Sequence, residues 1–282
     1  MPSFPTRVPG HIVPAPAVQT NLMTVPLARL NSETGHYEMF DASGGWFRPL
    51  PGYTQQVDKS IAKHFVKIGG DWLNPKAFVL IEYLRGKVFC HTPERTFTYQ
   101  IGKDTAVLNR LVADGGLTQI VSRKWVNLGK AMFYSVELGC LYFKSNRRNY
   151  LKPDAGFRPA LLKYMEQNWV RHEDHGGPGK PYNYNPRYAA ILTDRKYVTW
   201  NNGVLTSLEK LSKPDQKRIL ESVPWVAVEA SAYRRTETDY EVNPEHVTTL
   251  GDWLMTLDGP WERLHITKQY AGRVRAAMDK LR

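Results

Sequence analysis

The sequence is poor in cysteine and has no long apolar run, and both shortages narrow the class of protein. Cys90 and Cys140 show no metal-ligand spacing, so we expect them to be reduced and structural. No apolar stretch approaches the roughly 18 residues that a membrane-spanning helix needs. The N-terminus has no compact apolar core typical of a signal peptide. We therefore expect a cytoplasmic protein with no membrane partner.

Acidic residues are outnumbered by basic residues, and the excess is unevenly distributed. The chain has 38 lysines and arginines against 27 aspartates and glutamates, a net charge of +11. Residues 1–60 are neutral overall, whereas residues 61–150 contain fourteen basic and six acidic side chains. Concentrated positive charge is the electrostatic signature of a phosphate-binding surface. We therefore expect nucleic acid, and specifically double-stranded DNA, as the partner.

Composition divides the chain into three segments. Residues 1–58 form a proline-rich N-terminal arm, because repeated prolines disfavour long helices and central strands. Short strands are predicted over residues 25–30 and 36–40, and a partly disordered tail is the alternative up to Leu30. Residues 59–150 are predicted to form the DNA-binding domain and residues 151–282 a C-terminal α+β domain. No internal repeat of fixed period is evident.

The central segment combines a short helix, a glycine stop and two β-rich runs. Residues 103–112 are predicted to form an amphipathic helix, ended by Gly115. Strands are predicted over residues 118–126 and 131–137, joined across a turn at residues 127–130. The outer face of the helix would present Lys103, Thr105, Asn109 and Arg110. Asparagine can bond an adenine edge, and lysine or arginine a guanine or a phosphate. A polar-faced helix followed by a basic hairpin predicts a winged helix-turn-helix.

The predicted hairpin and the linker after it would supply phosphate contacts. Arg123, Lys124 and Lys130 lie around the hairpin, and Arg147 and Arg148 lie in the basic linker. A basic hairpin is typical of a wing that lies against the phosphate backbone or a minor groove. These five residues therefore join the helix residues as predicted DNA contacts.

This order of features resembles the winged-helix domain of plasmid and phage replication initiators. The resemblance is carried by FVKI at 65–68, LNPKAFVLIEYLRG at 73–86, IGKDTAVLNRLVADGGLTQIVSR at 101–123 and GKAMFYSVEL at 129–138. One departure is that residues 88–100 are strand-like where a helix is expected. The resemblance implies a sequence-specific protein that binds origin repeats and recruits host replication proteins. It allows a homodimer and requires neither catalysis nor a cofactor.

Further helices and strands are predicted on both sides of the central helix. The predicted helices cover residues 76–85, 159–172, 205–211, 213–222, 244–257 and 266–281. The predicted C-terminal strands cover residues 225–229 and 238–242, with Arg234 and Arg235 in the bend between them. The C-terminal domain is therefore expected to be mainly helical. It could hold a second winged helix, although a helical hairpin against a small sheet is the interpretation we favour.

No arrangement of residues indicates an enzyme. His172 to His175 lack the His-Glu-x-x-His spacing of zinc hydrolases, and the glycine-rich run at 176–180 lacks the ending of a phosphate loop. We expect no metal and no cofactor. The alternatives to an initiator are a winged-helix transcriptional regulator, a phage structural or host-interaction protein that does not bind DNA, and a nuclease.

Overall fold

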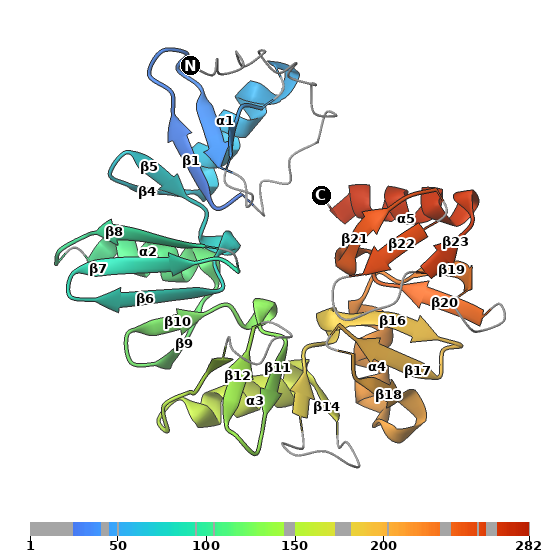
Figure 1. The fold of residues 1–282 in the computed structure, drawn as a ribbon. Helices are drawn as coiled ribbons and strands as arrows, with labels where there is room; N and C mark the ends of the chain where they lie inside the picture. Colours follow the sequence, from blue (N-terminus) through green and yellow to red (C-terminus); the bar gives the residue numbers. More distant parts are fainter. Residues whose placement is uncertain are drawn as a thin grey trace, which may run out of the picture.

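The computed structural model describes residues 25–40, 45–49, 51–93, 95–103, 105–143, 150–172, 182–201, 203–231, 238–252, 254–257 and 264–281. Within these ranges one arrangement occurs five times: three antiparallel strands followed by a helix. We call each of these a unit, and the units follow one another around an open arc (Figure 1).

The units have the following bounds. Unit 1 contains β1 (Leu27–Leu30), β2 (Tyr37–Phe40), β3 (Trp46–Phe47) and α1 (Thr54–His64). Unit 2 contains β6 (Leu80–Leu84), β7 (Lys87–His91), β8 (Thr96–Gln100) and α2 (Thr105–Gly115). Unit 3 contains β11 (Phe133–Ser135), β12 (Cys140–Tyr142), β13 (Tyr150–Leu151) and α3 (Arg158–Asn168). Unit 4 contains β16 (Ala189–Thr193), β17 (Tyr197–Trp200), β18 (Leu205–Ser207) and α4 (Lys213–Ser222). Unit 5 contains β21 (Val247–Leu250), β22 (Leu254–Leu257), β23 (Leu264–Ile266) and α5 (Lys268–Leu281).

A β-hairpin connects each unit to the next. The hairpins are β4 (Val66–Ile68) with β5 (Asp71–Leu73), β9 (Thr118–Val121) with β10 (Lys124–Val126), β14 (Val170–His172) with β15 (Tyr182–Tyr184), and β19 (Val226–Ser231) with β20 (Thr238–Val242). Each hairpin pairs back onto the first strand of the unit before it, which gives sheet orders such as β8-β7-β6-β10-β9. In the last sheet β23 also pairs with β19, so units 4 and 5 share eight strands.

An asparagine ends every connecting hairpin. Asn74, Asn127, Asn185 and Asn243 precede the short 3-10 helices η2 (Pro75–Ala77), η3 (Leu128–Lys130), η4 (Pro186–Tyr188) and η6 (Pro244–His246). Each side chain accepts a hydrogen bond from the backbone N–H two residues later, at 3.0–3.2 Å. Asparagine is favoured at such caps because its side-chain oxygen satisfies an amide that the turn leaves without a partner. The asparagines stand 53, 58 and 58 residues apart, so the units repeat in the structure without a fixed period in the sequence.

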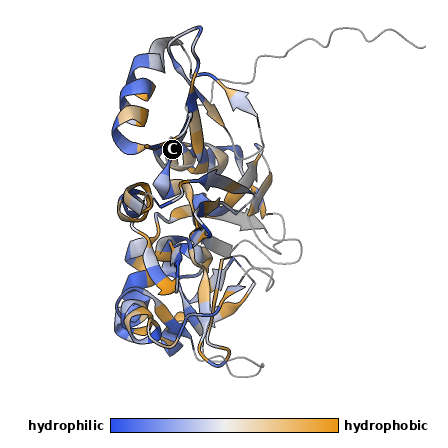
Figure 2. Ribbon diagram, turned by 90° about the vertical axis from the view of Figure 1, so that its left-hand side faces the viewer, coloured by the Kyte–Doolittle hydropathy of each residue, from blue (hydrophilic) through white to orange (hydrophobic). Residues whose placement is uncertain are grey.

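The turns lie on two opposite edges of the arc. β6 starts beside η2 and ends at the Arg85–Gly86 turn, whereas β10 starts at the Ser122–Arg123 turn and ends at η3. Figure 1 shows β10 ending on the concave side, which we call the inner edge, and the β6–β7 and β9–β10 turns on the convex side, which we call the outer edge. In side view the helices form one layer and the strands the other (Figure 2). Among the described residues, no helix combines the length and apolar content needed to cross a bilayer.

The core follows from the stacking of successive units. The described residues form five apolar clusters, and single clusters combine residues of neighbouring units. One of them joins Phe133 and Tyr142 of unit 3 to Trp200 and Ile219 of unit 4. Strands β11 and β12 are buried at every position. Such strands contain continuous apolar runs, because both faces lie against other parts of the protein.

The predicted fold class, a central winged helix with a mainly helical C-terminal domain, is wrong. Strands β9 and β10 cover residues 118–126 and pair with each other. The run at 131–137 contributes β11, which belongs to a different sheet. The expected turn of the wing at 127–130 is the asparagine turn with η3. Two adjacent β-rich runs were therefore assigned to one hairpin when they belong to consecutive units.

Three predicted helices contain strands instead. Residues 76–85 form most of η2 and then β6, residues 205–211 form β18 and η5 (Leu208–Lys210), and residues 244–257 form η6, β21 and β22. Short apolar runs cannot be assigned to a strand or a helix from periodicity alone. The predictions of α2, α4 and α5 are confirmed. Ser212 caps α4, because its Oγ accepts a hydrogen bond from the Asp215 N–H at 3.3 Å.

Candidate nucleic-acid interface

Four basic residues lie at the outer edge of unit 2 and of the β9–β10 hairpin that pairs with it. Arg85 lies in the β6–β7 turn, Lys87 begins β7, Lys103 lies between β8 and α2, and Arg123 lies in the β9–β10 turn. All four are exposed. We call these four residues the cationic rim.

Hydrogen bonds hold the three turns of the rim together. The backbone N–H groups of Ile101 and Gly102 both donate to the Gly86 carbonyl at 2.9 Å. The Tyr83 hydroxyl donates to the Gly102 carbonyl at 2.7 Å, and the Tyr83 N–H donates to the Arg123 carbonyl at 2.9 Å. The backbone positions of all four basic residues are therefore fixed relative to one another, although they come from distant parts of the sequence.

Two of the rim arginines occupy an unfavourable backbone conformation. Arg85 has a φ of 52° and Arg123 a φ of 61°, in the left-handed region that favours glycine and asparagine. Placing an ordinary side chain there costs about 1–2 kcal/mol. Such strain is often found at functional positions, where the side chain matters more than the turn.

The rim charges are not neutralised by the described part of the chain. None of the four residues forms an ion pair with a described carboxylate, whereas Lys124 beside them binds Glu82 at 2.6 Å. The nearby carboxylate of Asp154 accepts the Ser122 N–H at 2.8 Å. The outer edge of unit 2 therefore presents four positive charges to solvent.

The predicted reading helix is formed as α2, but it lies in the helix layer. Thr105, Asn109 and Arg110 are exposed on it, and Arg110 pairs with Asp114 at 3.2 Å. Lys103 precedes this helix and belongs to the cationic rim. The structure therefore places Lys103 at the outer edge with the basic hairpin, and it places Asn109 and Arg110 on the helix.

The remaining predicted contacts have other positions. Lys130 lies at the inner edge, where its Nζ donates to the Ala77 carbonyl at 2.8 Å. Arg147 and Arg148 lie outside the described residues. Arg85 and Lys87 were missed because residues 76–85 were assigned to a helix. The signal that could have found them is the run Arg85-Gly86-Lys87, since a glycine between apolar runs indicates a hairpin turn.

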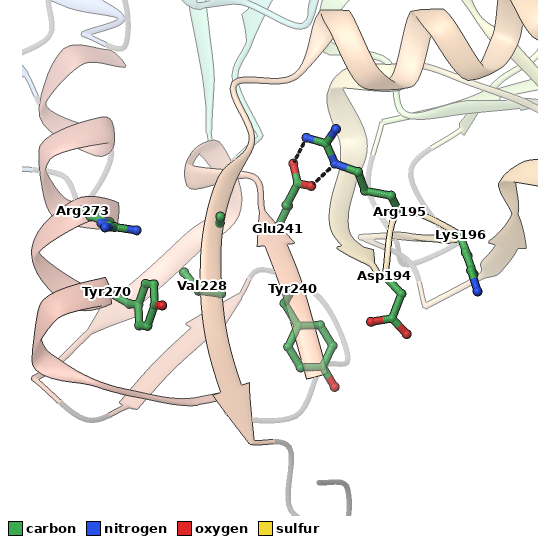
Figure 3. A pocket seen from close by; sticks show the side chains of 9 residues that line it. Asp194, Arg195, Lys196, Val228, Tyr240, Glu241, Tyr270 and Arg273 are labelled. Atoms are coloured by element: carbon green, nitrogen blue, oxygen red, sulfur yellow. Dashed lines mark hydrogen bonds and ion pairs between the residues drawn. The ribbon is translucent and has the colours of Figure 1, made fainter. Parts of the chain in front are cut away.

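A hollow in the surface lies between unit 4 and α5, and we call it the α5 hollow. It has a volume of about 590 Å³ and contains side chains of Asp194, Arg195, Lys196, Tyr240, Tyr270 and Arg273. Figure 3 shows Tyr270 and Arg273 on the α5 side and the β16–β17 turn on the opposite side. Both carboxylate oxygens of Glu241 accept hydrogen bonds from Arg195, at 2.5 and 3.2 Å.

Neither cysteine is placed for chemistry. Cys90 and Cys140 are both free and buried, and burial raises the pKa of the Cys90 thiol to about 12. A thiol with a raised pKa is a poor nucleophile at neutral pH. Within the described ranges, no group of three or more His, Cys, Asp or Glu side chains could hold a metal ion.

Comparisons with known proteins add no relative from which a function could be inferred. No family model matches the sequence, and no curated protein and no solved structure is significantly similar to it.

Proposed function

We propose that this protein binds double-stranded DNA and that the cationic rim of unit 2 contacts the phosphate backbone. The single observation that carries the proposal is the fixed grouping, from three separate turns, of four exposed cations that form no ion pair with a described carboxylate. Lysine and arginine that neutralise phosphates release condensed counterions, which is the main source of sequence-independent DNA affinity.

The composition of the rim favours a duplex over a single strand. Proteins that hold single strands usually stack the bases on exposed aromatic rings. The aromatic residue beside the rim, Tyr83, is partly buried and uses its hydroxyl to bind the Gly102 carbonyl. Phosphate contacts position a protein on a duplex but carry no sequence information directly. Base reading by Asn109 of α2 remains a separate prediction.

The proposed activity is narrower than the role implied by the resemblance to replication initiators. That resemblance was based on a winged helix, and the central segment instead forms parts of two repeated units. The charge distribution and the rim support DNA binding independently of that fold. We therefore restrict the proposal to duplex binding.

The test is a titration of a fluorescent duplex of about 20 base pairs at several salt concentrations. The double substitution Arg85→Gln with Arg123→Gln should weaken binding by about tenfold to a hundredfold, because two charge-assisted contacts are lost. The slope of log affinity against log salt should fall by about 1.8, since each phosphate contact contributes about 0.9.

A matched control removes two charges from the helix layer. Lys59→Gln with Lys63→Gln changes exposed residues of α1, and it should leave both the affinity and the salt slope within about twofold of the wild type. An equal loss in both variants would show general electrostatic attraction, and no loss in the rim variant would refute the proposed interface.

A further inference from the structure

The α5 hollow contains two cationic groups that the described residues do not neutralise. Arg273 of α5 and Lys196 of the β16–β17 turn both contribute to its walls, and neither forms an ion pair with a described carboxylate. Arg195, the third cation, is already held by Glu241. Figure 3 shows this pair across the hollow from Arg273.

The equivalent hollow between units 3 and 4 has two arginines in its walls, Arg171 of β14 and Arg218 of α4, and Arg218 is bound to its neighbours. It has a volume of about 370 Å³ and contains Arg218 of α4. The guanidinium of Arg218 donates to Asp215 Oδ1 at 2.6 Å, to the Trp169 carbonyl at 2.9 Å and to the Glu166 carbonyl at 2.9 Å. This arginine therefore ties α4 to the end of α3.

Arg273 is the counterpart of Arg218, but its surroundings differ. Each arginine directly precedes the buried residue that anchors its helix, Val274 in α5 and Ile219 in α4. Three residues before Arg273 the helix has Tyr270 where α4 has Asp215. The guanidinium of Arg273 lies over the Tyr270 ring at 5.2 Å. Arg273 therefore leaves a positive charge in the α5 hollow, whereas Arg218 holds α4 against the end of α3.

The other walls of the α5 hollow combine apolar and hydrogen-bonding groups. Tyr240 and Val228 are buried and form apolar surface, while Asp194 is exposed in the facing turn. A carboxylate accepts hydrogen bonds from hydroxyl groups, as acidic residues do with ribose in nucleotide sites. A volume of about 590 Å³ lies within the range of small-molecule sites.

We propose that the α5 hollow binds a small phosphorylated ligand with a planar ring, of the mononucleotide class. Arg273 binds the phosphate, with Lys196 adding positive potential from the opposite wall. Asp194 accepts hydrogen bonds from sugar hydroxyls, and the ring packs against the tyrosines. This site is separate from the cationic rim, which belongs to unit 2, so its occupancy does not depend on DNA binding.

The test is calorimetric titration of the full chain with adenosine monophosphate, adenosine and inorganic phosphate as separate probes. Adenosine monophosphate should bind with a dissociation constant below about 1 mM, and each of the other two probes should bind at least about tenfold more weakly. Arg273→Gln should weaken adenosine monophosphate binding by about tenfold to a hundredfold, because a charge-assisted contact is lost.

The matched control is Arg275→Gln on the same helix, where Arg275 pairs with Asp252 at 3.9 Å and does not line the hollow. This variant should bind within about twofold of the wild type. Three results would overturn the inference: no binding at about 5 mM, equal loss in both variants, or equal affinity for phosphate alone. An unlabelled duplex should not displace the nucleotide, so failure of this site and failure of DNA binding are distinguishable.

Discussion

The inner and outer edges of the arc are built from turns of opposite character. At the inner edge an asparagine caps each of the four connecting turns, and its side chain accepts a backbone hydrogen bond of 3.0–3.2 Å. At the outer edge the turns differ from unit to unit: Arg85–Gly86 in unit 2, residues 136–139 in unit 3 and Asp194 to Lys196 in unit 4. The asparagine that recurs in the inner turns indicates a requirement of the fold, whereas the outer turns can differ in sequence and contribute to function.

Units 2 and 3 show how much the outer edge can change on one scaffold. Unit 2 presents the four cations of the rim. The corresponding turn of unit 3 presents Val136 and Leu138, which are 41% and 52% exposed, with Glu137 between them. Both units keep the same order of strands. The chemistry of a turn therefore changes without changing the path of the chain.

The largest expected effect on stability tests the inner edge. Asn185 is buried, and its Nδ2 donates to the Gly129 and Ala131 carbonyls at 3.1 and 2.9 Å. Asn185→Ala should lower the free energy of unfolding by about 3 kcal/mol, because buried carbonyls lose their partners in addition to the cap. Urea unfolding of both proteins measures the difference.

Asn127 provides the matched control for this substitution. It caps η3 by accepting the Gly129 N–H at 3.0 Å, and it is only partly buried. Asn127→Ala should therefore cost about 1 kcal/mol, the typical value for a lost cap. Equal losses in the two variants would mean that the bonds from Asn185 to the preceding turn contribute nothing.

A smaller effect separates two lysines that both lie in the basic segment. Lys130 donates to the Ala77 carbonyl at the inner edge, and Lys87 belongs to the rim. Lys130→Met should lower the free energy of unfolding by about 1 kcal/mol and leave the salt slope of DNA binding unchanged. Lys87→Met should leave stability unchanged and lower the salt slope by about 0.9. A lower salt slope for Lys130→Met and lower stability for Lys87→Met would contradict the roles assigned to the inner and outer edges.

The smallest expected effect is a pH dependence from His91, at the inner end of β7. Burial lowers the pKa of His91, the Lys124 charge also lowers it, and Glu82 opposes both. As pH falls below about 6.5, the unfolded chain therefore takes up the proton first. Stability should decline slightly through the window from that value down to the pKa in the folded protein. His91→Gln should flatten the melting temperature between about pH 7 and pH 5, and an unchanged profile would exclude this histidine as a cause.

The sequence predicted individual elements better than their arrangement. Helices α2, α4 and α5 follow from amphipathic spacing and caps such as Ser212, all of which are local signals. Residues 76–85 were assigned to a helix because the apolar run there fits a buried strand and a helix equally well. The repeat was missed because the asparagines recur at both 53 and 58 residues, so no single period fits them.

Only part of the candidate interface could be predicted from the sequence. The local excess of charge and the basic hairpin residue Arg123 are properties of the sequence, and they point to the segment of the chain that contains the proposed rim. The turn that contains Arg85 lies beside Arg123 because the Tyr83 N–H donates to the Arg123 carbonyl. Lys103 lies beside the same turn because the Gly102 N–H donates to the Gly86 carbonyl. Contacts between residues this far apart are not visible in local spacing.

The sequence by itself determined helices α2, α4 and α5 and the charge excess of residues 61–150, because each depends on neighbouring residues or on composition. Only the tertiary structure decided which strands pair, which charges are compensated and which remain free. Lys130 and Lys87 are alike in sequence, yet one donates to a carbonyl of the preceding unit and the other faces solvent. That difference arises from the stacking of units, which brings Lys130 of η3 against Ala77 of η2 and leaves Lys87 exposed.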